Sequence, residues 1–214
     1  GVIGLCPIHV QAGSMARIAV TPEHVNARAG EIIRFSARAM DAQGNIIPAE
    51  IAWSLEPEDS GHAISPEGTF ELIRAGETTV VATADNVRGE AEVRIEADTL
   101  TQLILSPDQI NLKAGESMAV AVDGRDVHGN AVTASPQWEV IPPELGTFTQ
   151  AGTFRAQKPG EGRLIASDRE ARATIPVEVQ RGEIHRLTVE LPHENIMAGK
   201  TFQFTAGGFD KGGN

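Results

Sequence analysis

The sequence predicts an all-β protein built from tandem β-sandwiches arranged end to end. Three observations support this fold class. The chain resembles itself at a separation of about 84 residues, its apolar residues alternate with polar ones, and its 22 Gly and 12 Pro are scattered among short segments. Alternation with a period of two is typical of strands with one buried face, and regular turns between short strands are typical of sandwiches. We find no segment with the period of a helix.

The internal repeat is visible as identical residues at constant separation. The separation is 85 for Pro22/Pro107, Gly30/Gly115, Asp41/Asp126, Gly44/Gly129 and Trp53/Trp138, and 84 for Gly68/Gly152, Phe70/Phe154 and Gly76/Gly160. One residue is therefore lost between Trp138 and Gly152, which marks a loop that tolerates a change in length. A third copy begins near Glu183, with Gly199 and Asp210 lying 84 positions after Gly115 and Asp126.

These separations predict four segments. Residues 15–98 form the first repeat, 99–182 the second and 183–214 an incomplete third, after an N-terminal segment of residues 1–14. That segment is a short apolar run ending in Val-x-Ala, which resembles the tail of a secretory signal peptide. A strand of an earlier repeat is the alternative. A lipid anchor on Cys6 is disfavoured, because Leu5 stands where a small residue is needed. No run is long enough to span a membrane.

Strands are predicted from the alternation inside each repeat. In the first repeat Ile33, Phe35, Ala37 and Ala39 share one face, and Arg34, Ser36 and Arg38 lie on the other. The third repeat places Phe202, Phe204, Ala206 and Gly208 at the corresponding positions. The last strand of the first repeat buries Ala91, Val93 and Ile95. Each of these segments predicts a strand with one face in the core.

About seven such strands in some 84 residues indicate an immunoglobulin-like sandwich. Trp53 and Trp138 follow the same turn in their repeats, and we expect them to fill the space between the sheets, with Phe35, Phe70 and Phe154 as further core residues. The chain has one Cys and no Tyr, so an inter-sheet disulfide and a tyrosine corner are both absent. Hydrophobic packing must therefore hold each sandwich.

The phrase Asp-x-x-Gly-Asn occurs three times, at equivalent places in the three repeats. Its residues are Asp41, Gly44 and Asn45; Asp126, Gly129 and Asn130; and Asp210, Gly213 and Asn214. Asp accepts backbone N–H bonds at the start of a turn, and Gly and Asn tolerate positive φ, so we interpret the phrase as a structural hairpin turn. The alternative is a calcium loop. Such a loop needs acids at alternating positions and a distal Glu, which these segments lack.

The pattern resembles a known family of repeats. Pro22, Gly30, "DAQGN" followed by "IAWSL", and "SPEGTFELIRAGETTVVATA" are similar to the bacterial immunoglobulin-like repeats of invasin- and intimin-type adhesins and of the related group 2 repeats. The second repeat shows the pattern again in "DVHGNAVTASPQWEV" and "AGTFRAQKPGEGRLIAS". The resemblance covers residues from about 16 onward. It implies stalks or spacers of secreted and cell-surface proteins, some of them adhesive at their tips, with no catalytic residues.

Composition and motifs argue against several other functions. The net charge is −11 and the isoelectric point is about 5.0, which disfavours binding to nucleic acid or anionic lipid. A single Cys excludes a cysteine-based zinc site. The six His form no zinc-binding pair, and neither Gly-x-Ser-x-Gly nor a Walker loop occurs. We therefore expect no enzymatic activity, no cofactor and no metal.

The incomplete third repeat leaves Phe202 and Phe204 on a face without a partner in the 214 residues. Either the sequence is part of a longer array, or the segment docks on another chain by strand addition. The main hypothesis is a spacer or adhesive stalk of an extracytoplasmic bacterial protein. The alternatives are a subunit of an extracellular filament or surface layer, and accessory domains of a secreted polysaccharide-acting enzyme. Expected partners are other repeats, neighbouring subunits, or a host or cell-surface protein or glycan.

Overall fold

The computed structural model describes residues 11–58, 61–149, 152–190, 198–199 and 201–214. The described elements are β-strands and one short 3₁₀ turn, so the protein is all-β, as the sequence predicts. Its contacts group into two compact units. Unit 1 extends to Thr99 and also includes Asp126–Ala131, while unit 2 comprises Leu100–Arg125 and Val132–Asn214. Cys6 and most of the predicted signal-like segment lie outside the described residues.

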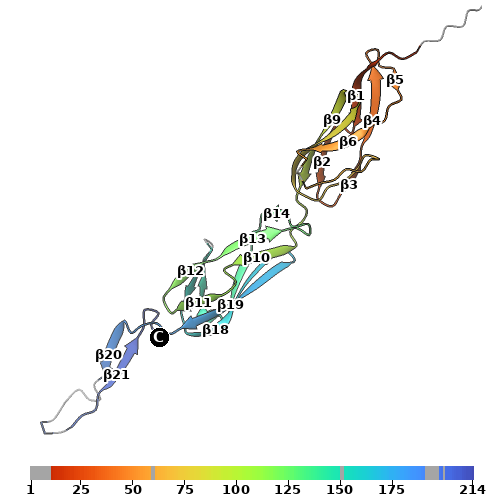
Figure 1. The fold of residues 1–214 in the computed structure, drawn as a ribbon. Helices are drawn as coiled ribbons and strands as arrows, with labels where there is room; N and C mark the ends of the chain where they lie inside the picture. The colour runs from red at the N-terminus through yellow and green to blue at the C-terminus, as the bar shows by residue number, and fades with distance from the viewer. Residues whose placement is uncertain (1–10, 59–60, 150–151, 191–197, 200) are drawn as a thin grey trace, which may run out of the picture. The chain divides into compact units, whose positions relative to one another are not determined.

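Unit 1 consists of two layers of strands (Figure 1). One layer is the four-stranded sheet β2-β9-β8-β6, made of His24–Arg28, Val87–Glu96, Gly76–Ala84 and Ala52–Glu56. The other holds the sheet β1-β4-β5, made of Met15–Thr21, Ser36–Asp41 and Ile46–Ile47, and the pair β3-β7, made of Ile32–Arg34 and Thr69–Glu71. Strand β2 runs parallel to β9, and the other pairs are antiparallel.

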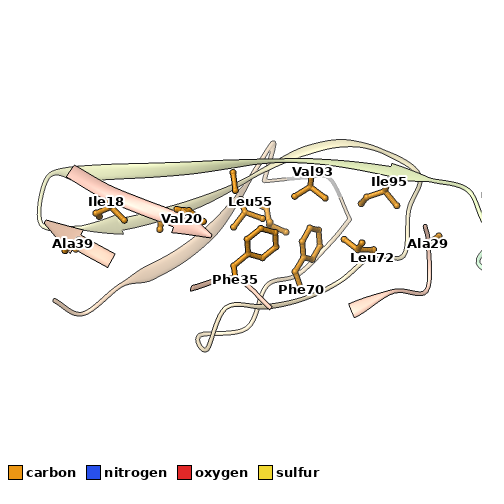
Figure 2. Close-up of a cluster of buried hydrophobic side chains, with 14 residues drawn as sticks. Ile18, Val20, Ala29, Phe35, Ala39, Leu55, Phe70, Leu72, Val93 and Ile95 are labelled. Atoms are coloured by element: carbon orange, nitrogen blue, oxygen red, sulfur yellow. The ribbon is translucent and has the colours of Figure 1, made fainter. Parts of the chain in front are cut away.

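The core of unit 1 lies between these layers because the strands alternate. Ala91, Val93 and Ile95 are 1–3% exposed along β9, and the charged residues between them face solvent. Figure 2 shows the Phe35 and Phe70 rings pointing toward the strand that carries Val93 and Ile95. Both rings are buried, and burying a side chain of this kind contributes roughly 1.5–3 kcal/mol.

Unit 2 repeats this design with the sheet β11-β19-β18-β15, made of Ile110–Lys113, Ala171–Gln180, Gly160–Asp168 and Gln137–Ile141. The opposing strands form the sheets β10-β13-β14 and β12-β17-β16. These strands are Gln102–Ser106, Ala121–Arg125 and Ala131–Val132, and then Ser117–Ala119, Thr153–Ala156 and Gly146–Phe148. The 3₁₀ turn η1, Pro143–Leu145, precedes β16. Phe154 is fully buried at the centre of this core.

The two Trp side chains pack at the side of the cores rather than at their centres. Trp53 and Trp138 are both half-buried. Trp53 is tilted against Phe35, with ring centroids 6.4 Å apart. Trp138 stacks on Phe148 at 4.1 Å. The central space is occupied by the buried Phe side chains, which leaves part of each indole at the surface.

Residues of the third repeat form one antiparallel pair in unit 2, β20 (Arg186–Glu190) with β21 (Thr205–Phe209). Leu187 and Val189 of β20 are 68% and 63% exposed, whereas the equivalent Ile18 and Val20 of β1 are each 7% exposed. Phe202 and Phe204 precede β21 and are not in a strand. The equivalents of Phe202, Ile33 in β3 and Met118 in β12, pair with β7 and β17, whereas residues 201–204 pair with no such strand among the described residues.

Candidate functional site: the Asp-x-x-Gly-Asn turns

The three Asp-x-x-Gly-Asn segments share one backbone geometry. Each begins at a buried Asp at the end of a strand: Asp41 closes β4, and Asp126 and Asp210 directly follow β13 and β21. The first turn connects the antiparallel strands β4 and β5, and the second connects the neighbouring strands β13 and β14. The Asp N–H donates to the Asn carbonyl at 2.9–3.0 Å, and the Gly N–H donates to the Asp carbonyl at 3.1 Å. The φ angles of Gly44, Gly129 and Gly213 are +88°, +84° and +83°, a region that favours glycine.

The Asp carboxylate binds its own turn. In the first turn Asp41 Oδ1 accepts from the N–H groups of Gln43 and Asn45, at 3.0 and 2.8 Å. Its Oδ2 accepts from the Asn45 side-chain amide at 2.8 Å. Asp126 repeats the three bonds with His128 and Asn130, at 2.9, 2.8 and 2.8 Å. The Asn is therefore required for its side-chain amide rather than for a positive φ, since none of the three has one.

The same carboxylate also holds the segment through which the chain enters the repeat. Oδ2 of Asp41, Asp126 and Asp210 accepts from the backbone N–H groups of Gly13, Asp98 and Gly182, at 2.9, 2.9 and 3.1 Å. All three bonds span 28 residues. The turn thus fixes the start of each repeat as well as reversing the chain.

The Asn of the second and third turns bonds to the preceding repeat. Within unit 1, Asn130 Oδ1 accepts from the Ala75 N–H at 2.8 Å, and its Nδ2 donates to the Ile73 carbonyl at 2.9 Å. Within unit 2, Asn214 Nδ2 donates to the Gln157 carbonyl at 2.7 Å. Ile73 and Gln157 lie at equivalent positions of their repeats. We call each set of bonds from one turn to the preceding repeat a joint.

Glycine makes the close approach at each joint possible. A Cβ on Gly30 would lie 2.9 Å from His128 Nε2, and one on Gly115 would lie 3.0 Å from the Lys211 Cβ. Both glycines also have φ above +90°. The repeated Gly30/Gly115 pair in the sequence therefore marks the surface on which the following turn rests.

The Asp carboxyl group of each turn has a pKa below its ordinary value. The bond from the Asn45 amide, followed by that from the Gly13 N–H, lowers the pKa of Asp41 to about 2. Burial raises the pKa of Asp126, but the bonds from Asn130 and Asp98 outweigh it, and the pKa lies below its ordinary value. The Asn214 and Gly182 N–H groups likewise lower the pKa of Asp210. Each group is therefore a carboxylate at neutral pH and accepts bonds only.

The Asp carboxylates of the turns are bound by N–H donors rather than grouped with other possible metal ligands. In the described part of the chain, no group of three His, Cys, Asp or Glu side chains converges so that it could hold a metal ion. Nor does any described helix have the length and apolarity needed to cross a membrane.

Sequence reasoning identified the turn residues but missed their partners outside the turn. Gly13, Asp98 and Gly182 are not all of one residue type, because each contributes only its backbone N–H to the bond. Their common signal is position, since each precedes its Asp by 28 residues. A search for a fixed interval to the repeat start would have found them.

No protein-family model matches the chain, and no curated protein matches it in sequence. Among solved structures, it is similar to surface layer protein SbsC domains 4–9, at 15% identity and a TM-score of 0.43 over 94% of this chain and 37% of that one. The S-layer protein rSbsC(31-844) gives 14% and 0.45, over 95% and 32%. Mouse cadherin-23 EC22-24 gives 14% and 0.46, over 77% and 65%. The chain spans about a third of these S-layer chains.

Proposed function

We propose that the protein is a non-enzymatic structural spacer of an extracytoplasmic bacterial protein, in which each repeat is fastened to the one before it. The joint carries this proposal. The Asp126 carboxylate holds the segment that enters the second repeat, and Asn130 of the same turn holds two backbone groups of the first. Backbone partners do not depend on side-chain identity, so the arrangement suits repeats whose surfaces differ.

The spacer proposal predicts that neighbouring repeats keep a narrow range of distances in solution. Spin labels placed on exposed positions in the two units, Glu77→Cys and Thr133→Cys in a Cys6→Ser background, report that range by double electron–electron resonance. We expect a narrow distribution that broadens when Asn130→Ala removes the bonds to Ile73 and Ala75. Asn45→Ala is the matched control. An equally broad distribution with and without Asn130 would contradict the proposal.

The exposed face of β20–β21 favours a second candidate, a subunit of a surface layer or filament in which another chain covers that face. Leu187 and Val189, which share one face of β20, are 68% and 63% exposed, and Ile184 and Phe204 just outside the two strands are 71% and 51% exposed. Contiguous exposed apolar side chains mark interaction surfaces. Sedimentation at rising concentration tests the candidate. Association that is lost in Leu187→Ser with Val189→Ser supports it, and a monomer at every concentration contradicts it.

A further inference from the structure

Unit 2 contains an open groove of about 410 Å³ beside the third turn. Three cationic side chains line it, Arg155, Lys158 and Lys211, together with Gln157 and the backbone of Gly212–Asn214. The chain contains four Lys in all and has a net charge of −11, so this cluster runs against the overall charge. From it we infer that the groove binds the acidic groups of a polysaccharide, a function separate from that of the spacer.

The three cations are available to a ligand. All three are exposed, and within the described residues none of them is ion-paired. Arg155 lies in β17 between Ser117 of β12 and Thr147 of β16, which are neutral neighbours.

Two nearby carboxylates are already engaged by backbone groups. Glu116 Oε2 accepts from the Lys113 N–H at 2.8 Å. Asp210 is buried and accepts from Gly182 and Asn214. Both groups keep their negative charge, but among the described residues neither forms an ion pair with a cation of the groove.

The equivalent place in unit 1 has a different charge. Glu71 stands in place of Arg155 and Val127 in place of Lys211, although Arg74 corresponds to Lys158. The repeat architecture is the same in both units, so folding alone does not require three cations. Their presence at one joint points to a ligand there.

The neutral groups of the groove favour a sugar over other anions. Gln157 and the glycine backbone offer donors and acceptors for hydroxyl groups, and the lining has no aromatic side chain for stacking on a base. The volume lies at the small end of the roughly 300–1,000 Å³ of ligand pockets, which suits one or two sugar units. Duplex DNA carries a charge about every 1.7 Å, which this acidic chain would repel more strongly than a sparsely charged glycan.

Isothermal titration with polygalacturonate tests the inference, with neutral dextran and duplex DNA as comparison ligands and inorganic phosphate as a simple anion. The chain is measured with Asn214 as its last residue and with a short neutral C-terminal extension, because a free α-carboxylate on Asn214 would add an anion to the groove. We expect saturable binding of polygalacturonate that weakens with salt, and about tenfold weaker binding in Lys158→Gln with Lys211→Gln.

The control removes two exposed cations elsewhere, Arg38→Gln with Arg172→Gln, and so changes the net charge equally. We expect it to keep most of the affinity. Equal weakening in both double variants would show attraction by net charge alone and would overturn the inference. So would tighter binding of DNA or equal binding of dextran, and phosphate binding without polygalacturonate binding would exclude a polysaccharide.

Discussion

The second and third Asp-x-x-Gly-Asn turns share the hydrogen bonds of their Asp carboxylates but differ in the bonds that they make to the preceding repeat. Both carboxylates accept from their own Asn and from the N–H 28 residues earlier. Asn130, however, makes two bonds to the preceding repeat, and Asn214 makes one. The cause lies across the joint. Pro159 occupies the position equivalent to Ala75, and proline has no N–H to donate.

This difference separates two roles of one phrase. The local turn is specified by the five residues themselves and is nearly the same each time. The strength of the joint is specified by the preceding repeat, in residues about 55 positions away in sequence. Repeats with identical turns can therefore be joined to the preceding repeat by different numbers of hydrogen bonds.

The largest effect is expected from Asp126→Ala. This change leaves the N–H groups of Asp98, His128 and Asn130 without their acceptor. Stranding buried donors costs about 1–3 kcal/mol, so we expect the free energy of unfolding to fall by about 2–3 kcal/mol. Urea denaturation in a Trp53→Phe background, followed by Trp138 fluorescence, measures it.

Asp123→Ala is the control for this change. Asp123 is an exposed carboxylate on β13, the strand that leads into Asp126, and its removal changes the net charge by the same amount. We expect a change within about 0.5 kcal/mol. Similar losses in the two variants would mean that charge, and not the hydrogen bonds of Asp126, stabilises the turn.

A smaller effect is expected from Asn130→Ala when it is compared with Asn45→Ala. Both changes remove the amide bond to the Asp of the turn, at 2.8 Å in each case. Only the first also removes bonds to Ile73 and Ala75. We expect Asn130→Ala to cost about 1 kcal/mol more, and the Ala75 amide to exchange with solvent about fivefold faster or more. Equal costs would show that the joint adds no stability.

The all-β architecture could be predicted because its signal is local. Alternation along 90–96 assigns Ala91, Val93 and Ile95 to the buried face, and these residues are 1–3% exposed. The position of Trp53 was harder to predict. Its strand and face follow from the sequence. That its side chain is only half-buried depends on Phe35 and Phe70, which occupy the centre of the core against which Trp53 packs.

The joint could not be predicted from motifs for a related reason. Hydrogen bonds to the backbone of Ile73 or Gln157 leave no mark on residue type. The sequence shows only a missing donor, since Pro159 lacks the N–H that Ala75 provides at the equivalent position. Its meaning becomes clear only when Asn214 is known to face that position. Contacts between distant backbone groups therefore need coordinates, whereas turns and strand faces do not.

Pro159→Ala is expected to have a modest, stabilising effect on the joint. The change restores an N–H where Ala75 has one, so Asn214 Oδ1 gains a donor. We expect the coupling free energy between positions 159 and 214, measured by a double-mutant cycle with Asn214→Ala, to rise by about 0.5–1 kcal/mol. The cycle removes the effect of the Pro on the unfolded chain. Ala75→Pro should lower the coupling to Asn130, and unchanged coupling in both cycles would refute the role of residue 159.

The smallest effect concerns the acidity of the first turn. The pKa of Asp41 is lowered to about 2 by the Asn45 amide first and the Gly13 N–H second. Because the folded chain binds fewer protons than the unfolded one, Asp41 stabilises the fold above pH 4 and loses that contribution as the pH falls through about 2. A carboxyl NMR titration measures the pKa, which should rise more in Asn45→Ala than in Gly13→Pro, since Asn45 is the larger cause. An ordinary pKa of Asp41 in the unaltered protein would show that these bonds do not stabilise the carboxylate. A larger rise in Gly13→Pro would show that the Gly13 N–H bond contributes more than the Asn45 amide bond.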